Sequence, residues 1–497
     1  MPIRRHLTIV GSAARRRPWL LPAVLVYSLC RLPSFFEPHW YTDEAGYTIT
    51  ARTLLHGAPL YSQAWTNKPP LHIWAVALPL RLFGPSESGL HALTFLSGLL
   101  ALIGVGVLAS HLLSNRRTIV ATVLFAIAIG LPTFQAQLAL PESLLIAPAT
   151  WAAVIVFTRL LSDQPNDRLP RWIFALSAGA LMGVALGFQQ TALADAAVFG
   201  AAITIAPSRD RRAIAAYVLA LLAVVAAWLV PALLVAGSDT IAFALVGFYT
   251  GYVQYSLPVS PLGIALRALG PLLAIIGFFI ARRAGARTVA LCLWACADLG
   301  VSAIANRPYP HFLVPALAPC ILLLLSIPIP RVRLNWRLAP LTAAFVITLP
   351  FALLATADGN ALLAYATWPL AQLQGNRIDW DHSLDQRGPA DQQVAGWIRD
   401  QGLAGTSAVV WSSSAWPYLL ADLPVSLRAA PIYNDVVLLG SGHAVANTVD
   451  AMQPQLIVTS EEALEQWPEI GTVLDGNYQL VYESYPDKVY LRKQGGG

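Results

Sequence analysis

Two acidic residues stand side by side at Asp43-Glu44, and a lysine followed by two prolines, Lys68-Pro69-Pro70, comes later in the same polar stretch. A carboxylate can act as a general base toward a hydroxyl group. A lysine ammonium is a compact point charge suited to a phosphate, and the prolines stiffen the chain beside it. The pattern predicts a base and an anion-holding cation in one loop.

The setting of these residues favours chemistry but leaves structural alternatives open. Trp40, Tyr41 and Tyr47 would form an aromatic wall beside the acids. The alternative to a catalytic role is that Asp43 and Glu44 stabilise the N-terminus of a helix, an effect of about 0.3–1 kcal/mol. Lysine is rare in this chain, and the other cations next to the apolar runs are arginines. The alternative for Lys68 is an interfacial side chain that extends its ammonium to water.

Composition places most of the chain in a lipid bilayer. Of 497 residues, 56% are hydrophobic and 12% are charged, whereas about 25% are charged in soluble proteins. The net charge of +5 comes from arginines gathered in short loops, which is an orientation signal for a membrane protein. A nucleic-acid partner is therefore not expected.

Apolar runs divide the first part of the chain into about eleven predicted membrane crossings. They lie near 18–36, 88–112, 118–134, 143–161, 172–188, 192–206, 213–236, 263–281, 288–305, 312–327 and 338–356. With the N-terminus in the cytoplasm, every cytoplasmic loop contains arginines, as the positive-inside rule requires. The run 71–83 is too short to span and is expected to lie on the outer surface, within a first outer loop over 37–87.

This topology brings the chemically suggestive residues to the extracytoplasmic side. Asp43, Glu44 and Lys68 fall in the first outer loop. Later outer segments contain Glu142, Gln189, Gln190, Tyr249, Tyr252, Arg307, Tyr309 and His311. Because the arginine rule placed the loops without reference to these residues, their gathering on one side favours a site there.

The later outer segments supply the remaining candidates. Arg307 and His311, with Tyr309 between them, would bind the leaving phosphate or alternatively form part of an interfacial aromatic belt. Glu142 would orient the acceptor or alternatively complement the positive end of a helix. Tyr47, Tyr309 and Gln190 complete the set expected to orient the acceptor.

The composition changes near residue 357, and a linker is expected over 357–375. From residue 376 to 497 the chain is predicted to form a small extracytoplasmic α/β domain. Helices are expected over 391–400 and 444–452, strands over 407–411 and 456–459, and a terminal hairpin from strands over 478–484 and 489–492.

The loop containing Asp43-Glu44-Ala45-Gly46-Tyr47 and Lys68-Pro69-Pro70 resembles the first outer loop of the GT-C glycosyltransferases. The similarity is to the bacterial branch related to protein O-mannosyltransferases and the lipid A aminoarabinose transferase. It extends, more weakly, through Glu142 and the stretch from Arg307 to Phe312. The resemblance implies an all-α polytopic membrane domain over 1–356, with Asp43 as catalytic base and Lys68 on the donor phosphate.

These observations predict an integral-membrane glycosyltransferase in the bacterial plasma membrane. Its donor would be a polyprenyl-phosphate-linked sugar, and its acceptor an envelope glycan, lipid or protein. Asp43 and Glu44 are the expected catalytic residues. No cofactor is required by the resemblance, although Asp43, Glu44, Glu142 and His311 offer ligands for a divalent metal. The alternatives are a polyprenyl-lipid or sugar transporter, for which the helices are too unbroken, and a glycan ligase.

Overall fold

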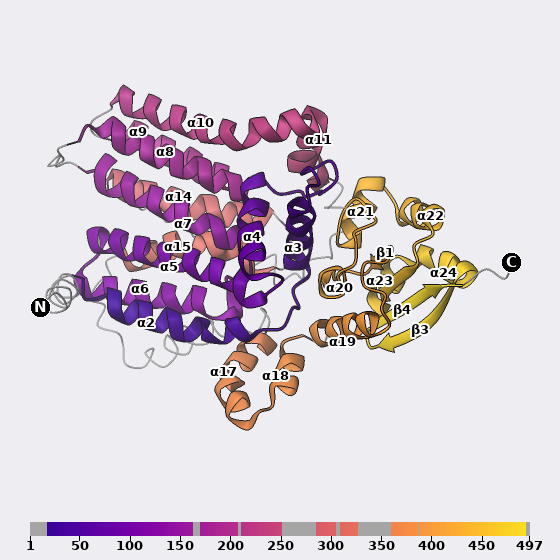
Figure 1. Ribbon diagram of the computed structural model, residues 1–497. Helices are drawn as coiled ribbons and strands as arrows, with labels where there is room; N and C mark the ends of the chain where they lie inside the picture. The colour runs from indigo at the N-terminus through magenta and orange to yellow at the C-terminus, as the bar shows by residue number, and fades with distance from the viewer. Residues whose placement is uncertain are drawn as a thin grey trace, which may run out of the picture.

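The computed structural model describes residues 17–162, 169–206, 210–250, 285–304, 309–326, 359–385 and 387–493. Figure 1 shows a bundle of long helices on the side of the N-terminus and a smaller domain with a β-sheet on the side of the C-terminus. Two helices, α3 (Thr42–Leu55) and α4 (Pro70–Phe83), run across the bundle between these two parts.

The bundle consists of apolar helices that lie side by side (Figure 1). They are α2 (Leu20–Arg31), α5 (Glu87–Leu112), α6 (Asn115–Gly130), α7 (Pro141–Ile155), α8 (Arg171–Phe188), α9 (Ala192–Ile205), α10 (Arg211–Ala236), α14 (Ala286–Ile304) and α15 (Val314–Ser326). Shorter helical turns extend or join them: η1 (Leu32–Phe36), η2 (Pro132–Phe134), the π-helical η3 (Val156–Leu160) and η5 (Pro310–Leu313).

The apolar runs predicted from the sequence match these helices, except that the runs near 263–281 and 338–356 lie outside the described residues. In the described part of the chain, 4 helices are long and apolar enough to cross a bilayer: α5, α7 with η3, α8 and α10. Other helices, including α9 and η5 with α15, are apolar but shorter. The number of about eleven crossings stays a prediction.

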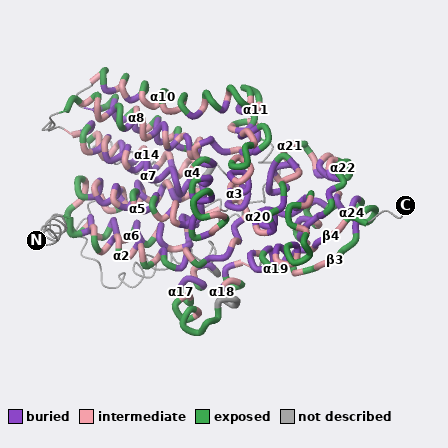
Figure 2. Tube along the Cα trace, viewed as in Figure 1, coloured by how far each residue is buried: buried purple, intermediate pink, exposed green. Residues whose placement is uncertain are grey.

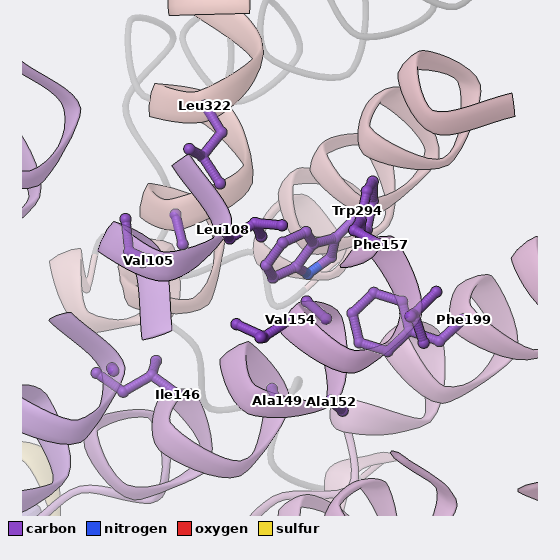
Figure 3. Packing of buried hydrophobic residues seen from close by; sticks show 14 of the residues in the cluster. Val105, Leu108, Ile146, Ala149, Ala152, Val154, Phe157, Phe199, Trp294 and Leu322 are labelled. Atoms are coloured by element: carbon purple, nitrogen blue, oxygen red, sulfur yellow. The ribbon is translucent and has the colours of Figure 1, made fainter. Parts of the chain in front are cut away.

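Aromatic side chains fill the centre of the bundle. Trp294 of α14 lies against Phe157 of η3 and Phe199 of α9 (Figure 3), and the ring centroids of Phe199 and Trp294 are 5.4 Å apart. Small residues bring other helices closer: a Cβ atom at Gly179 of α8 would overlap the backbone of Tyr217 on α10. Such close backbone approach at small residues is typical of helix packing in membranes.

Helix α10 presents much of its surface outward, as Figure 2 shows. Its side chains Leu219, Leu222 and Leu234 are among the exposed large apolar residues. An outward-facing apolar helix is costly in water but not in lipid. This exposure agrees with the membrane location predicted from composition.

The two crossing helices fall within the segment 37–87 that the sequence predicts as the first outer loop. Pro70 occupies the first turn of α4, where its missing N–H costs nothing. The 14 residues of α4 are too few to span a bilayer. Two further short elements, α11 (Ser238–Ala242) and η4 (Phe243–Gly247), follow α10.

The expected linker over 357–375 contains a helix, α17 (Gly359–Gln374), and α18 (Arg377–Leu384) follows it directly. These two helices lie beside the bundle (Figure 1). Tyr365 of α17 donates a hydrogen bond to Glu37, which follows η1. The segment is thus folded against the membrane part in the described structure.

The C-terminal domain is a four-stranded sheet covered by helices. The strands β1 (Ala408–Trp411), β2 (Leu456–Ser460), β3 (Tyr478–Ser484) and β4 (Asp487–Arg492) have the order β1-β2-β4-β3, with β1 parallel to β2 and the other pairs antiparallel. The helices are α19 (Arg387–Asp400), α20 (Trp416–Leu420), α21 (Ile432–Leu439), α22 (Gly442–Met452), α23 (Glu461–Gln466) and α24 (Gly471–Asn477), with the turn η6 (Pro468–Ile470).

Helix α3 is attached directly to this domain. Arg52 donates hydrogen bonds to the carbonyl oxygens of Tyr418 and Leu423, at 2.7 and 2.5 Å. At Gly46 the two parts come so close that an added Cβ would lie 2.9 Å from the carbonyl oxygen of Ala430. The domain is therefore packed onto the helix that contains Asp43 and Glu44.

Candidate active site

A cavity of about 460 Å³ opens where α3 crosses the bundle. Its polar lining includes Asp43, Tyr47, Asn67, Lys68, Glu142, Gln189, Gln190, Asp195, Tyr249, Asp298, Ser302, His311 and Tyr433. The remaining wall is apolar and includes Leu140, Leu145, Val246 and Pro315. A site with apolar walls and a few converging polar groups is typical of ligand-binding pockets.

Asp43 reaches the cavity from the first turn of α3. Its Oδ1 accepts a hydrogen bond of 2.9 Å from the hydroxyl of Tyr433, which lies on α21 of the C-terminal domain. The side chain of Asp43 is only partly buried. A carboxylate that is oriented by a donor and still open to a cavity is suited to accept a proton from a bound hydroxyl group.

Lys68 faces the same cavity from the segment before α4. The hydroxyl of Tyr61 donates a 2.7 Å hydrogen bond to the Lys68 carbonyl, which fixes the backbone. Its ammonium donates a 3.3 Å hydrogen bond to the Tyr249 hydroxyl and lies 6.0 Å from the centre of the Tyr47 ring. Within the described residues, no carboxylate oxygen comes within ion-pair distance of it.

The charge of Lys68 is preserved despite its burial. Burial alone would lower the pKa of the ammonium, but Tyr249, Glu142 and Asp43 offset this and raise the pKa above its usual value. A buried ammonium whose charged form is stabilised by its neighbours, and that has no ion pair with a carboxylate, is suited to bind an anion.

Glu142 and the two glutamines form a connected polar wall. Glu142 is buried in the first turn of α7 and accepts a 2.9 Å hydrogen bond from the Gln189 amide. Gln190 donates to the carbonyl oxygens of Asn67 and Leu245, at 3.0 and 3.1 Å. Gln190 thus connects the Lys68 segment to η4, while Glu142 keeps an acceptor available toward the cavity.

His311 and Phe312 of the last outer segment line the cavity. Nδ1 of His311 lies 2.9 Å from Oε1 of Gln135 and 3.3 Å from the Tyr41 hydroxyl. Tyr309 does not line the cavity but stacks on the His311 ring, with centroids 5.5 Å apart. Arg307, expected as a phosphate ligand, lies outside the described residues.

Glu44 does not point into the cavity, in contrast to the expectation that both acids act together. Its side chain is fully buried beside Glu87 and His91 at the start of α5. Burial raises the pKa of Glu44, but His91 and the hydrogen bond from the Ala139 N–H outweigh it, and the net shift is downward. Adjacent residues on a helix point in directions about 100° apart, which separates Asp43 from Glu44.

The divalent-metal set considered from the sequence is also divided by this geometry. Asp43, Glu142 and His311 line the cavity, whereas Glu44 belongs to another cluster. The described carboxylate and histidine groups that do converge closely are Glu44, Glu87 and His91.

Several cavity residues had no catalytic or binding role assigned from the sequence. Asn67 borders the lysine and was detectable as its neighbour, and Tyr249 had been placed on the outer side by the topology. Tyr433 had no local signal, because its role depends on how a distant domain packs. Asp195 and Asp298, within the bundle helices α9 and α14, line the inner part of the cavity.

The described elements form a fold similar to that of the GT-C membrane glycosyltransferases: a helical bundle, crossing helices at one end and an appended domain. The similarity to this superfamily predicted from the loop motif is confirmed at the level of the fold. No protein-family model matches the sequence, and no curated protein matches it.

Among solved structures, the chain is similar to ArnT from Cupriavidus metallidurans, a lipid A aminoarabinose transferase. Against ArnT bound to undecaprenyl phosphate, the TM-score is 0.65 at 17% identity, covering 95% of this chain and 98% of ArnT. Against the apo state, the TM-score is 0.63 at 15% identity, with 97% and 98% covered. The apo Archaeoglobus fulgidus oligosaccharyltransferase gives 0.51 at 13% identity, with 96% and 74% covered.

Proposed function

We propose that this chain is an integral-membrane glycosyltransferase that transfers a sugar from a polyprenyl-phosphate donor to an extracytoplasmic acceptor. The observation that carries the proposal is the convergence of the Asp43 carboxylate and the Lys68 ammonium on one cavity with apolar walls. The similarity of the fold to ArnT, whose structure contains undecaprenyl phosphate, supports a lipid-phosphate donor.

The donor phosphate would bind at Lys68, with His311 on the same cavity wall. The ammonium would stabilise the negative charge that develops on the leaving phosphate, where an enclosed site strengthens the interaction. The prenyl chain would lie along Leu140, Leu145 and Val246. Arg307 remains a prediction from the sequence as a second phosphate contact.

The reaction follows from this placement. An acceptor hydroxyl oxygen attacks the anomeric carbon and forms the new glycosidic bond, while its proton passes to Asp43. The bond between the anomeric carbon and the phosphate oxygen breaks, and the polyprenyl phosphate leaves with the electron pair. Attack opposite the leaving group inverts the anomeric configuration. General-base assistance of this kind contributes about 10²–10⁴ in rate.

The acceptor would lie between Asp43 and the C-terminal domain. Glu142, Gln190 and Tyr47 border this part of the cavity and would orient the acceptor or the sugar. Tyr433 brings the C-terminal domain to the reacting groups, which supports a role of that domain beside the acceptor. The envelope acceptor can be a glycan, a lipid or a protein within this proposal.

The arginine-rich loops support a multi-pass location in the bacterial plasma membrane, with the N-terminus in the cytoplasm and the C-terminal domain outside. Nucleotide sugars are not supplied on that side, whereas lipid-linked sugars are accessible from the membrane. The expected orientation therefore agrees with the proposed donor.

The test combines transfer with binding in purified protein reconstituted in nanodiscs. A panel of polyprenyl-phosphate-linked hexoses and pentoses is offered with envelope fractions, and the products are identified by mass spectrometry. Wild-type protein should transfer one sugar, and Asp43→Asn should reduce transfer at least about 100-fold. Both proteins should bind undecaprenyl phosphate equally in native mass spectrometry, with the neutral polyprenol as the control ligand.

Three results would overturn the proposal. Full transfer by Asp43→Asn would remove Asp43 as the base. Equal binding of undecaprenyl phosphate and of the neutral polyprenol would remove the lipid phosphate as the recognised group. Movement of the lipid across the bilayer without covalent transfer would instead identify a transporter.

A further inference from the structure

A compact cluster of ionisable side chains lies behind α3, outside the cavity. It contains Glu44 of α3 with Glu87 and His91 of α5, whose side chains are 0%, 5% and 0% exposed. One oxygen or nitrogen atom from each lies within 4.8 Å of the others. A fourth group, His39, places its Nε2 3.5 Å from Oε2 of Glu87.

The polar atoms that face one another in this cluster have no hydrogen-bond partners within the described part of the chain. They are Oε2 of Glu44, Oε1 and Oε2 of Glu87, Nε2 of His91 and Nε2 of His39. The nitrogen of His91 lies 3.6 Å from Glu87 and 3.8 Å from Glu44, beyond normal hydrogen-bond length. Burying so many unpaired polar atoms is costly unless something binds between them.

The opposite sides of the same groups are held in place. Nδ1 of His91 lies 2.5 Å from the carbonyl oxygen of Ser34. Because a carbonyl can only accept, Nδ1 bears the proton and a neutral ring leaves a lone pair on Nε2, toward the two carboxylates. The other oxygen of Glu44 accepts a hydrogen bond from the Ala139 N–H. Metal-binding histidines and carboxylates are typically oriented by such partners.

From this geometry we propose that Glu44, Glu87 and His91 form a zinc site with three protein ligands. Zinc bonds of about 2.0–2.2 Å to nitrogen and oxygen, in tetrahedral arrangement, place neighbouring ligand atoms roughly 3.3–3.6 Å apart. The separations of 3.6 and 3.8 Å between His91 and the two carboxylates are close to this spacing. Magnesium suits the cluster less well, since it usually keeps several waters.

The ion would connect two helices. Glu44 belongs to α3, and Glu87 and His91 belong to α5. Glu44 and Asp43 are neighbours in the first turn of α3. An ion that holds Glu44 would therefore also hold the backbone that orients Asp43. The zinc would have a positioning role, without contact with the substrate.

The first test is the metal content of full-length protein purified without chelators. Elemental analysis should find about one zinc per chain, because a bound ion would satisfy the buried, unpaired ligand atoms. Glu87→Gln and His91→Asn should each lose most of this zinc. The matched control is Glu142→Gln, another buried glutamate near the start of a helix, which should retain the zinc whatever its effect on transfer.

A second measurement uses wild-type protein only, in case the variants fail to fold. After removal of metal by a chelator, added Zn²⁺ should raise the midpoint of thermal unfolding and saturate at one equivalent. Added Co²⁺ should give the intense visible absorption of tetrahedral cobalt. These readouts do not depend on transfer, so the zinc site and the proposed function can fail separately.

The proposal is overturned if wild-type protein from zinc-replete medium contains no zinc and its unfolding midpoint does not respond to Zn²⁺. The cluster would then be a carboxyl pair that shares a proton. Zinc retained in both Glu87→Gln and His91→Asn would overturn it as well, because the ion would then lie elsewhere.

Discussion

The hydroxyl of Tyr433 donates a 2.9 Å hydrogen bond to Oδ1 of Asp43. The two residues belong to different parts of the molecule, since Asp43 lies on α3 and Tyr433 on α21 of the C-terminal domain. The contact therefore makes the C-terminal domain a direct neighbour of the proposed base. It also explains how a domain outside the bundle can influence the reaction.

Replacing Tyr433 by phenylalanine should lower transfer while leaving donor binding intact. A hydrogen bond to a charged group contributes about 1.5–3 kcal/mol, so loss of the orienting hydroxyl should reduce kcat by about 10-fold to 100-fold. The KM for the lipid donor should stay unchanged, because the hydroxyl contacts Asp43 and not Lys68. Steady-state kinetics in nanodiscs would measure both values.

The control is Tyr485→Phe, which removes a hydroxyl from an exposed tyrosine of the same domain. This variant should transfer at the wild-type rate. If Tyr433→Phe also keeps the wild-type kcat, the hydrogen bond contributes nothing to catalysis and the domain does not act through it.

The sequence placed Asp43 and Lys68 in one predicted loop, and both side chains line the same cavity. Their roles in the reaction stay predictions. Glu44 was grouped with Asp43 because the two are adjacent. Both residues lie on α3, and adjacent side chains on a helix point in different directions.

Other parts depended on contacts between distant segments. The strands and helices of the C-terminal domain were predictable from their alternating and helical patterns, as β1, β2, α19 and α22 illustrate. Their packing onto α3 was not, since Tyr433 and Arg52 act only once the domain is in place. The segment over 357–375 was expected as a linker because the composition changes there, yet it contains a helix whose Tyr365 and Trp368 contact Glu37 and Phe36.

Replacing Lys68 by alanine should weaken use of the lipid donor. Loss of the phosphate contact should raise the donor KM by at least about tenfold, because charge-assisted contacts of this kind are strong. Lys68→Arg should recover only part of the affinity, since the broad guanidinium does not fit the space of a compact ammonium. Donor titrations at fixed acceptor concentration would measure the change.

Lys493→Ala is the matched control, because it removes a lysine from the exposed surface of the C-terminal domain. It should leave the donor KM unchanged. An unchanged KM in Lys68→Ala would mean that the phosphate binds elsewhere, even if kcat fell.

Replacing Gly46 by alanine should loosen the contact between α3 and the C-terminal domain. In a helix interior, glycine to alanine normally stabilises by up to about 1 kcal/mol. At Gly46 the new Cβ would lie 2.9 Å from the Ala430 carbonyl oxygen and 2.9 Å from Cδ of Pro431, so one side must move. The displacement should weaken the Tyr433–Asp43 hydrogen bond and reduce kcat about as much as Tyr433→Phe does.

Gly396→Ala provides the comparison, since Gly396 lies within α19 and an added Cβ there would meet no atom within 4 Å. This variant should be neutral or slightly stabilising. Equal rates for Gly46→Ala and wild type would show that the close approach of the two parts is not needed for transfer.

The C-terminal domain should lose stability as the pH rises through the neutral range. Burial raises the pKa of Asp487 to about 7 and also raises the pKa of the neighbouring Asp391 well above its usual value. In the unfolded chain an aspartate titrates near pH 4. The folded state therefore binds the proton more tightly, and this stabilising contribution, complete below about pH 4, declines as the pH rises to about 7.

Asp487→Asn removes the titrating group and should flatten this pH dependence of stability. Hydrogen exchange of the β2–β4 peptides, corrected for intrinsic rates, should show protection falling from pH 5.5 to 8 in wild type but not in Asp487→Asn. Asp475→Asn, at an exposed aspartate of α24, should keep the wild-type slope. The same slope in Asp487→Asn would mean that another group causes the pH dependence.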